Sequence, residues 1–415
     1  SKKEYFFLIA LNNNEIDKEV LTPEILWKFG RITEFEISPD GKFVAYIVKR
    51  YSLEKNKGNS EIFISSSDGK DTRQITFTTY SESVIHWHPN GQKIGFLSSK
   101  NGTSQIWEID LKGKNLRQIS SLSGNIDNFM YSPTGENILF TMRVKTDTSA
   151  QDKYPDLPLS TGRVYTDLMY RHWDSWWDYC YSHIFVAKIK NNKLYDIKDI
   201  NESEPYDTPL APYFESTDIT WSPDGSKIAY VSKKLKGKEA SLSTNSDVYL
   251  FDLKTNTTRN LTEGMLGYDR YPVFSHNGKM ICWSSMQTPG YESDKERLML
   301  YDFQTNKLTY LTSDFDQNAS SMVWSEDDKC IYFISGINAT YQIYKIDINN
   351  KKIVQLTRGW HDYTSIFRSG GVMIGSKMSF SLATELFNVD ENGKEKQITF
   401  VNQNIYSAIE MGKVC

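Results

Sequence analysis

The sequence has few cysteines, little net charge and no long apolar segment. Its four cysteines stand at positions 180, 282, 330 and 415 without C-x-x-C spacing, which argues against a disulfide framework and a thiolate metal cluster. The net charge of −4 is too small to indicate a nucleic-acid partner or a polybasic membrane contact. No apolar run approaches the roughly 18 residues of a membrane span. We therefore expect no metal, no cofactor, no nucleic-acid partner and no membrane span.

The sequence motifs of common catalytic sites are also missing. The chain has no G-x-S-x-G nucleophile elbow, no Walker loop, no G-x-G-x-x-G loop, no H-E-x-x-H motif and no EF-hand loop. With six histidines in all, a histidine-dependent triad or a zinc site has few candidates. We therefore predict no catalytic residue within these 415 residues.

What the sequence does have is an internal repeat, and its first motif is a turn. The pattern is S-P-D-G, in which proline fixes φ, aspartate bonds its own backbone and glycine takes a positive φ. Alternating apolar residues flank each copy, so each copy predicts a β-hairpin. Full or weaker copies occupy residues 38–41, 88–91, 132–135, 222–225, 275–278 and 325–328.

The second motif is a short apolar strand that follows each turn and usually ends in aspartate. A third motif, of the type Gln-Ile-Thr, closes most units, so that each unit holds four short strands in a period of about 42 to 50 residues. Such a period is typical of β-propeller blades. We predict an all-β fold, a seven-bladed β-propeller of four-stranded blades. The strand motif occurs at residues 62–64, 106–110, 184–186, 248–252, 298–302, 343–347 and 386–390.

The regular spacing fails in the third and fourth units. These two units contain more residues than the repeat needs, and the extra residues lie mainly at 145–183, with a smaller share at 233–247. Loops of such length in a compact repeat are usually functional or disordered. Residues 163–178 are too aromatic for disorder, since three tryptophans within five residues must be buried or must contact something. This long aromatic insertion in the third blade either packs over the propeller or forms a wall of a binding pocket.

Carboxylates of the insertion are candidates for binding a cationic ligand group. Propeller loops converge on the mouth of a central tunnel, where unpaired carboxylates would attract a substrate's ammonium group, although each could equally be a solvated loop charge. Asp174 is the preferred candidate, because neighbouring tryptophans could exclude water and strengthen a charge-assisted bond. Asp178, Glu202 and Glu204 are further candidates. The predicted substrate-binding residues are Asp167, Arg171, His172, Trp173, Asp174, Trp176 and Glu292.

Five central segments carry a resemblance to a known family. They are residues 153–158, 167–176, 242–247, 260–265 and 290–295. Over roughly residues 21–415 the chain resembles the bacterial dipeptidyl-peptidase 5 enzymes of the prolyl oligopeptidase family of serine peptidases. Members of this family place a propeller before an α/β-hydrolase domain that carries a Ser, Asp and His triad.

The resemblance implies that this chain is the propeller part of a serine dipeptidyl peptidase and lacks the catalytic domain. The parent enzyme would release dipeptides from oligopeptide N-termini in the periplasm or outside the cell. The propeller would exclude folded proteins, hold the substrate's free amine and contact its own hydrolase domain. Related dipeptidyl peptidases hold that amine with a pair of glutamates, but this sequence has no Glu-Glu pair.

The expected division of the chain follows from the repeat and the resemblance. Residues 1–30 would form an N-terminal arm with a short helix, residues 31–400 the propeller, and residues 401–415 a linker toward the absent hydrolase domain. The apolar run at 6–11 is either part of an ordered arm or a signal-peptide remnant. The alternative to a peptidase propeller is a stand-alone periplasmic binding or scaffold propeller of TolB type. A glycan-binding propeller is a third interpretation.

Overall fold

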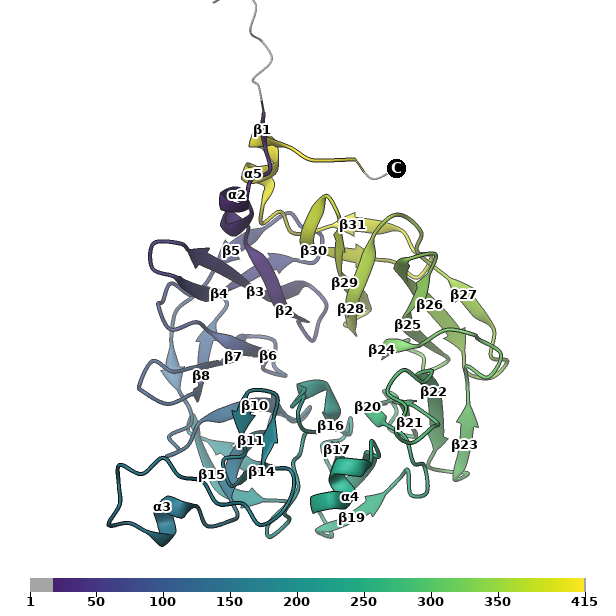
Figure 1. Cartoon of the computed structure of the whole chain (residues 1–415). Coiled ribbons are helices and arrows are strands. Elements are labelled where there is room, and N and C mark those ends of the chain that lie inside the picture. The colour runs from purple at the N-terminus through teal and green to yellow at the C-terminus, as the bar shows by residue number, and fades with distance from the viewer. Residues whose placement is uncertain (1–17, 414–415) are drawn as a thin grey trace, which may run out of the picture.

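Four-stranded antiparallel meanders follow one another around a central axis in the computed structural model, which describes residues 18–413 (Figure 1). Five meanders are separate sheets. Two more share one eight-stranded sheet, because Tyr341 pairs with Asp362 in parallel. We call each meander a blade and number the blades along the chain. The predicted all-β propeller fold is confirmed.

The first three blades take up the chain from residue 31 to residue 199. Blade 1 consists of β2 (Arg31–Ile37), β3 (Phe43–Ser52), β4 (Lys57–Ser66) and β5 (Thr72–Gln74). Blade 2 consists of β6 (Ser83–Trp87), β7 (Lys93–Ser98), β8 (Gln105–Asp110) and β9 (Arg117–Gln118). Blade 3 consists of β10 (Ile126–Tyr131), β11 (Asn137–Lys145), β14 (Cys180–Lys190) and β15 (Lys193–Asp199).

Four further meanders, blades 4 to 7, follow along the chain. Their strands are, for blade 4, β16 (Ile219–Trp221), β17 (Lys227–Ser232), β18 (Asp247–Asp252) and β19 (Thr257–Asn260); for blade 5, β20 (Asp269–Phe274), β21 (Met280–Ser285), β22 (Arg297–Asp302) and β23 (Lys307–Tyr310); for blade 6, β24 (Ser320–Trp324), β25 (Cys330–Ile337), β26 (Thr340–Asp347) and β27 (Ile353–Gln355); and for blade 7, β28 (Asp362–Ser369), β29 (Val372–Ser379), β30 (Leu382–Val389) and β31 (Glu395–Gln397).

The repeated S-P-D-G turn joins the first two strands of a blade, as its composition predicts. In blade 1 the Ser38 hydroxyl donates to an Asp40 carboxylate oxygen at 2.7 Å and accepts the Phe43 N–H at 3.0 Å. Gly41 has a φ of 73°, and a Cβ there would lie 2.6 Å from the carbonyl oxygen of Gly370. Glycine is thus required both by the turn and by the close approach of blade 7.

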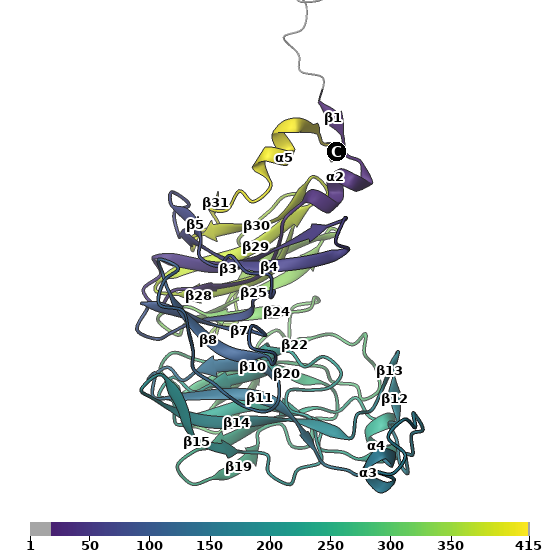
Figure 2. The same cartoon turned by 90° about the vertical axis from the view of Figure 1, so that its left-hand side faces the viewer.

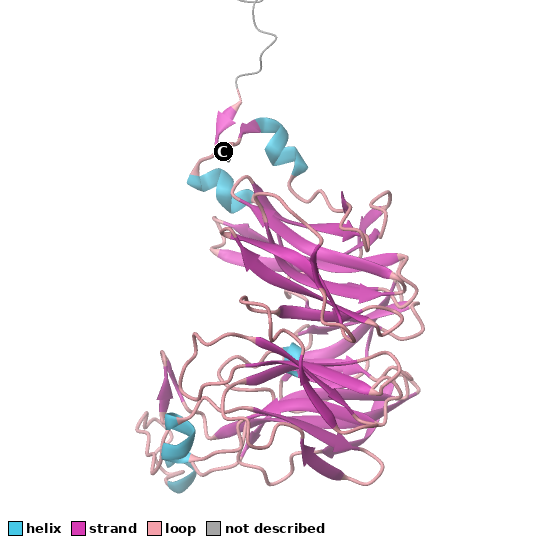
Figure 3. Ribbon diagram, turned by 90° about the vertical axis from the view of Figure 1, so that its right-hand side faces the viewer, coloured by secondary structure: helices cyan, strands magenta, loops and turns pink. Residues whose placement is uncertain are grey.

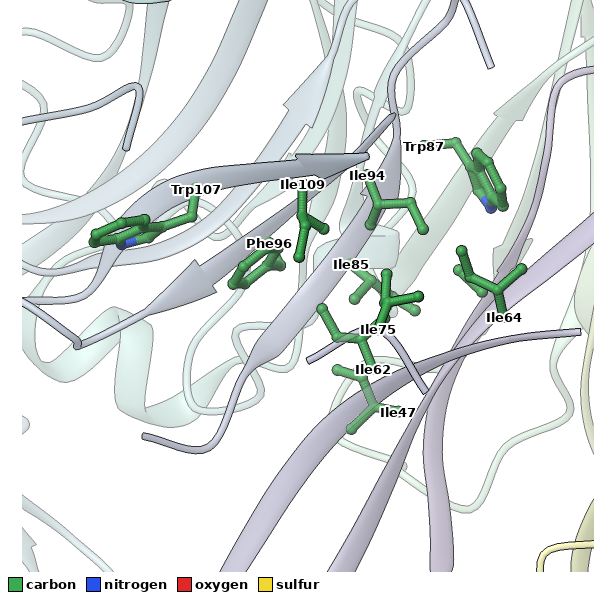
Figure 4. Close-up of a cluster of buried hydrophobic side chains, with 11 residues drawn as sticks. Ile47, Ile62, Ile64, Ile75, Ile85, Trp87, Ile94, Phe96, Trp107 and Ile109 are labelled. Atoms are coloured by element: carbon green, nitrogen blue, oxygen red, sulfur yellow. The ribbon is translucent and has the colours of Figure 1, made fainter. Parts of the chain in front are cut away.

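The hydrophobic core lies between neighbouring blades. Figure 4 shows one such layer, in which isoleucines of blade 1 such as Ile47 and Ile62 face Ile94 and Trp107 of blade 2. Each blade therefore buries apolar side chains on both of its faces, which explains the nearly continuous apolar character of the middle strands. A blade cannot bury both faces alone, so each blade depends on its neighbours.

Carboxylates near the axis join successive blades through backbone N–H groups. Glu34 of blade 1 accepts from the N–H groups of Val84 and Ile85 at 3.1 and 3.2 Å, where β6 bulges and Val84 has a φ of 51°. Asp218 likewise accepts from Tyr271 at 3.2 Å, where β20 bulges. These inner acids satisfy donors that the bulges leave unpaired.

Blades 1 and 7 meet through side chains, and within residues 18–413 neither blade takes a strand from the other. The Ser65 hydroxyl donates to the Ile398 carbonyl at 3.2 Å, and the Asn388 amide donates to the Ser67 carbonyl at 2.9 Å. A separate contact joins the two ends of the described chain. There Asn402 accepts from the Gly30 N–H at 2.7 Å and donates to the Gly30 carbonyl at 2.9 Å.

Short elements lie before and after the ring. The helix α2 (Pro23–Lys28) precedes blade 1, and α5 (Gln403–Ala408) follows blade 7. The strand β1 (Glu19–Val20) pairs in parallel with β32 (Ile409–Glu410). The apolar run at residues 6–11 lies outside the described residues. Within residues 18–413, no helix has the length and apolar character needed to cross a membrane.

Candidate functional site

Long connections gather on one face of blades 3 to 5, which we call the front face. Figures 2 and 3 show the hairpin of the insertion and the helices α3 (Ala150–Lys153) and α4 (Gly237–Leu242) on this side of the ring. The connections are 146–179, 201–218, 233–246 and 286–296. They contact one another, since the Gly290 N–H donates to the Thr244 hydroxyl at 2.9 Å.

The aromatic residues of the insertion pack mainly on one another. Tyr165 stacks on Tyr179 with ring centroids 5.2 Å apart and on Trp176 with centroids 6.1 Å apart. Its hydroxyl donates to the Trp177 carbonyl at 2.7 Å, and Trp177 contacts Tyr181 at the start of β14. Stacked aromatic pairs of this kind stabilise a loop beyond the area that they bury. The insertion is thus an ordered unit with its own aromatic core.

A short hairpin in the insertion brings together five of the predicted binding residues. It consists of β12 (Arg171–His172) and β13 (Ser175–Trp176), joined by the tip residues Trp173 and Asp174. The Arg171 guanidinium lies 5.4 Å from the Trp176 ring centroid, and its Nε donates to the Trp173 carbonyl at 3.0 Å.

The tip of this hairpin is open to solvent. The Trp173 side chain is 88% exposed, and Asp174 is exposed and accepts from the Ser175 hydroxyl at 3.0 Å. The two tryptophans therefore do not enclose Asp174 in the described residues. Its role in binding an amine stays a prediction.

The other two predicted residues lie apart from the hairpin but on the same face. Asp167 approaches Gly237 at the start of α4 so closely that a Cβ there would collide with its carboxylate. Glu292 accepts from the Tyr268 hydroxyl at 3.3 Å. The seven residues thus share the front face without forming a single cluster, and their binding role stays a prediction.

Arg143, near the end of β11, joins the base of the insertion to the connection 201–218. Its guanidinium donates to Asp178 at 2.5 Å, to Asp207 at 3.3 Å and to the Cys180 carbonyl at 3.0 Å. The guanidinium also lies 5.5 Å from the ring centroid of Phe214. Sequence reasoning missed this residue because it belongs to a regular strand. Its place just before a long insertion is the one signal that could have marked it.

Asp207, one of the partners of Arg143, has a shifted pKa. Burial raises the pKa of Asp207 to about 6, although the Ser182 N–H and Arg143 both favour the ionised form. Asp178 repels the same negative charge and raises the pKa further. Asp207 therefore changes its charge close to neutral pH.

A second arginine lies beside this group, in blade 5. Arg270 donates to Asp218 at 2.7 Å and to Glu215 at 3.0 Å, and its guanidinium lies 4.5 Å from the Tyr213 ring centroid. Burial raises the pKa of the nearby Glu296, and Glu215 contributes by repulsion. The four connections of the front face together contain fifteen Asp or Glu and eight Lys or Arg residues, so this face is acidic and can attract a cationic group.

Metal binding finds no support in the part of the chain that the structure describes. Between residues 18 and 413 no group of three or more His, Cys, Asp or Glu side chains is placed to hold a metal ion. The arrangement is one of charges and aromatic surfaces, which suits a ligand with both polar and apolar parts.

No protein-family model matches the sequence. The chain is 40% identical over 388 residues to dipeptidyl-peptidase 5 of Porphyromonas gingivalis, covering 93% of this chain and 57% of that protein. It is 39% identical over 386 residues to dipeptidyl-peptidase 5 of Porphyromonas endodontalis, covering 93% and 56%. The match lies in the N-terminal part of these proteins, and the chain spans slightly more than half of their length. The resemblance to dipeptidyl-peptidase 5 is confirmed.

Solved structures with the same fold include an acylaminoacyl peptidase of Pyrococcus horikoshii. It aligns with a TM-score of 0.69 at 16% identity, over 95% of this chain and 56% of that one. The β-propeller domain of the Trilobed protease from Pyrococcus furiosus, which has an open velcro topology, aligns with a TM-score of 0.60 at 16% identity. That alignment covers 92% of this chain and 98% of the domain. At such low identity these likenesses show the propeller fold alone.

Proposed function

We propose that this chain is the substrate-admitting and substrate-binding propeller of a serine dipeptidyl peptidase. The parent enzyme would release dipeptides from oligopeptide N-termini, and an α/β-hydrolase domain outside these 415 residues would carry the Ser, Asp and His triad. The observation that carries this proposal is the 40% identity with a dipeptidyl-peptidase 5 over 93% of the chain but only 57% of that protein. The 415 residues alone would then be inactive, and the parent enzyme would act in the periplasm or outside the cell.

The front face supplies the chemistry that such a propeller needs. The N-terminal ammonium group of a peptide is largely charged at neutral pH, since its pKa is about 8. A carboxylate that accepts its N–H bonds would bind it more strongly than a neutral acceptor would. Asp174 at the hairpin tip is the carboxylate that we assign to this task. Glu292 in the connection 286–296 and Asp167 beside α4 lie apart from it and are the alternatives.

The exposed aromatic side chains would bind the rest of the peptide. Trp173 and Trp176 offer apolar surface, and Arg171 and His172 offer donors for peptide carbonyls. A second protein surface that closed over the hairpin tip would bury Trp173 and remove water from Asp174. Its carboxylate would then bind an ammonium group more strongly than it does in open solvent. The hydrolase domain of the parent enzyme is the partner that we assign to this closure.

The isolated chain provides the first test. We expect no hydrolysis of dipeptidyl-4-nitroanilide substrates above a heat-inactivated control, because the chain has no G-x-S-x-G nucleophile elbow. We also expect oligopeptides with a free amine to bind more tightly than their N-acetylated forms in titration calorimetry. Activity well above the control would overturn the assignment of the triad to another domain. Equal affinity for both peptides would contradict amine recognition by the propeller.

A variant of the longer protein tests Asp174 directly. Asp174→Asn should raise KM for free-amine peptides by about tenfold, since losing one charge-assisted bond costs about 1.5 kcal/mol. Asp156→Asn, a change of another exposed insertion carboxylate, is the matched control and should leave KM unchanged. If both variants alter KM equally, Asp174 does not bind the amine.

A further inference from the structure

Arg143 connects three segments that are distant in the sequence. It belongs to β11 at the entrance of the insertion, Asp178 lies at the exit of the insertion, and Asp207 lies in the connection 201–218. Phe214, which the guanidinium also contacts, belongs to the same connection. One side chain thus holds together two parts of the front face.

The aromatic insertion behaves as one body, so its place depends on the contacts at its edge. Its internal bonds, such as the one from the Tyr179 hydroxyl to the Val164 carbonyl at 3.2 Å, hold it together without attaching it to the blades. It is attached to the rest of the chain by the Arg143–Asp178 pair, the Lys145–Asp152 ion pair, the contact of the Trp177 ring with Tyr181 and the contact of Asp167 with Gly237. The Arg143–Asp178 pair lies where the insertion meets the connection 201–218.

We infer that Arg143 is a positioning residue that holds the aromatic insertion against the connection 201–218, and that this hold tightens as the solution becomes more acidic. The inference deepens the proposed function, on which it rests, because the insertion carries most of the residues assigned to peptide binding. Neither Arg143 nor Asp207 needs to touch the peptide.

The direction of the pH effect follows from the sharing of one guanidinium by two carboxylates. Asp178 and Asp207 repel each other across Arg143, and the repulsion ends when Asp207 takes up a proton. The Asp207 side chain is 19% exposed, and this partial burial raises its pKa to about 6. Moving the insertion away would remove Asp178 and admit water, which would lower that pKa. The docked state binds the proton more tightly, so acid favours docking.

Other titratable groups face this contact and must be considered. His183 on β14, held by Asp199 at 2.8 Å, has a raised pKa because of that carboxylate, although burial opposes the effect. The positive charge of His183 favours the ionised form of Asp207, so it lowers the pKa of Asp207 and opposes the proposed effect. This contribution does not depend on where the insertion lies. The remaining groups that face the contact are Asp127 on β10, Asp178 at the exit of the insertion, and Cys180 and Tyr181 on β14.

Hydrogen exchange of the whole 415-residue chain, followed by mass spectrometry, tests the inference. Exchange of residues 160–179 is measured between about pH 5 and pH 7.5. The rates are corrected for the intrinsic exchange rate at each pH. Residues 286–296 on the same face serve as an internal reference. A docking-linked change of about one pKa unit in Asp207 predicts roughly fivefold higher protection at pH 5 than at pH 7.5. The reference segment should show no such trend.

Three variants decide the outcome. Asp207→Asn removes the charge, so it should give high protection of residues 160–179 at every pH. Arg143→Met should lower that protection, most strongly at neutral pH, because the two carboxylates would then repel each other without a cation between them. Arg143→Lys should restore it in part, because lysine reaches only one carboxylate. A pH dependence that persists in Asp207→Asn, or unchanged protection in Arg143→Met, would overturn the inference. Because exchange needs no substrate, this result is independent of the peptide-binding tests.

Discussion

Blade 5 and the aromatic insertion of blade 3 use the same residue type in opposite ways. Trp283 in β21 is fully buried between blades and donates to Asp269 at 2.9 Å. Trp173 at the hairpin tip is 88% exposed. Trp283 belongs to the core, because its blade buries side chains on both faces. Trp173 contributes little to the core. The comparison separates residues that hold the ring from residues available for binding.

The largest effect should come from the buried tryptophan. Trp283→Ala should lower the free energy of unfolding by about 3–5 kcal/mol, because it leaves a cavity and removes the indole donor of Asp269. Urea titrations followed by circular dichroism measure this change. Trp173→Ala is the matched control. Similar losses in both variants would break the distinction between the two regions.

The next effect concerns the carboxyl group beside Trp283. Burial raises the pKa of Asp269 to about 7, while Ser285 and Trp283 oppose the shift. The folded chain therefore binds this proton more tightly than the unfolded chain. Stability from this group is fully present below about pH 4 and is lost as pH rises to about 7. In blade 5, unlike in the exposed insertion, a single carboxyl should thus make stability depend on pH.

Asp269→Asn should remove that pH dependence. The variant should be more stable than the parent chain at about pH 8, by on the order of 3 kcal/mol, and the gain should shrink toward pH 4. Chemical unfolding at several pH values measures the difference. An unchanged slope of stability against pH would show that Asp269 is not the responsible group.

The smallest effect on stability should come from the hairpin tip. Trp173→Ala should change the free energy of unfolding by less than about 0.5 kcal/mol, because an exposed side chain loses little contact on truncation. The fluorescence lost in the variant should be the long-wavelength emission of a solvated indole. A loss at short wavelength would mean that Trp173 is buried in solution and would weaken the comparison.

Much of the fold follows from local patterns. The turn at residues 38–41 forms as expected because Ser38, Asp40 and Gly41 need only their own neighbours to close it. The alternation of apolar residues likewise predicts the strands. How blades 1 and 7 meet was not predictable, since the contact of Gly41 with Gly370 joins residues near opposite ends of the chain.

The candidate site was predictable only in part. The aromatic run led to the insertion and to five residues of one hairpin, because residues 171–176 are close in the chain. The structure places Asp167 and Glu292 on the front face as well, but apart from the residues of this hairpin. For Arg143 the sequence offered only its place just before the insertion, since its partner Asp207 stands 64 positions further along the chain.

The sequence by itself determined the repeat, the turns and the strands, because these depend on hydrogen bonds and side-chain alternation over a few residues. Only the tertiary structure decided which charges are paired and which titrate near neutral pH. Asp174 and Asp207 look alike in the sequence, but one lies at an exposed tip and the other is half-buried beside Arg143. Burial and through-space charges set the pKa of a carboxyl group, and both arise only when distant segments meet.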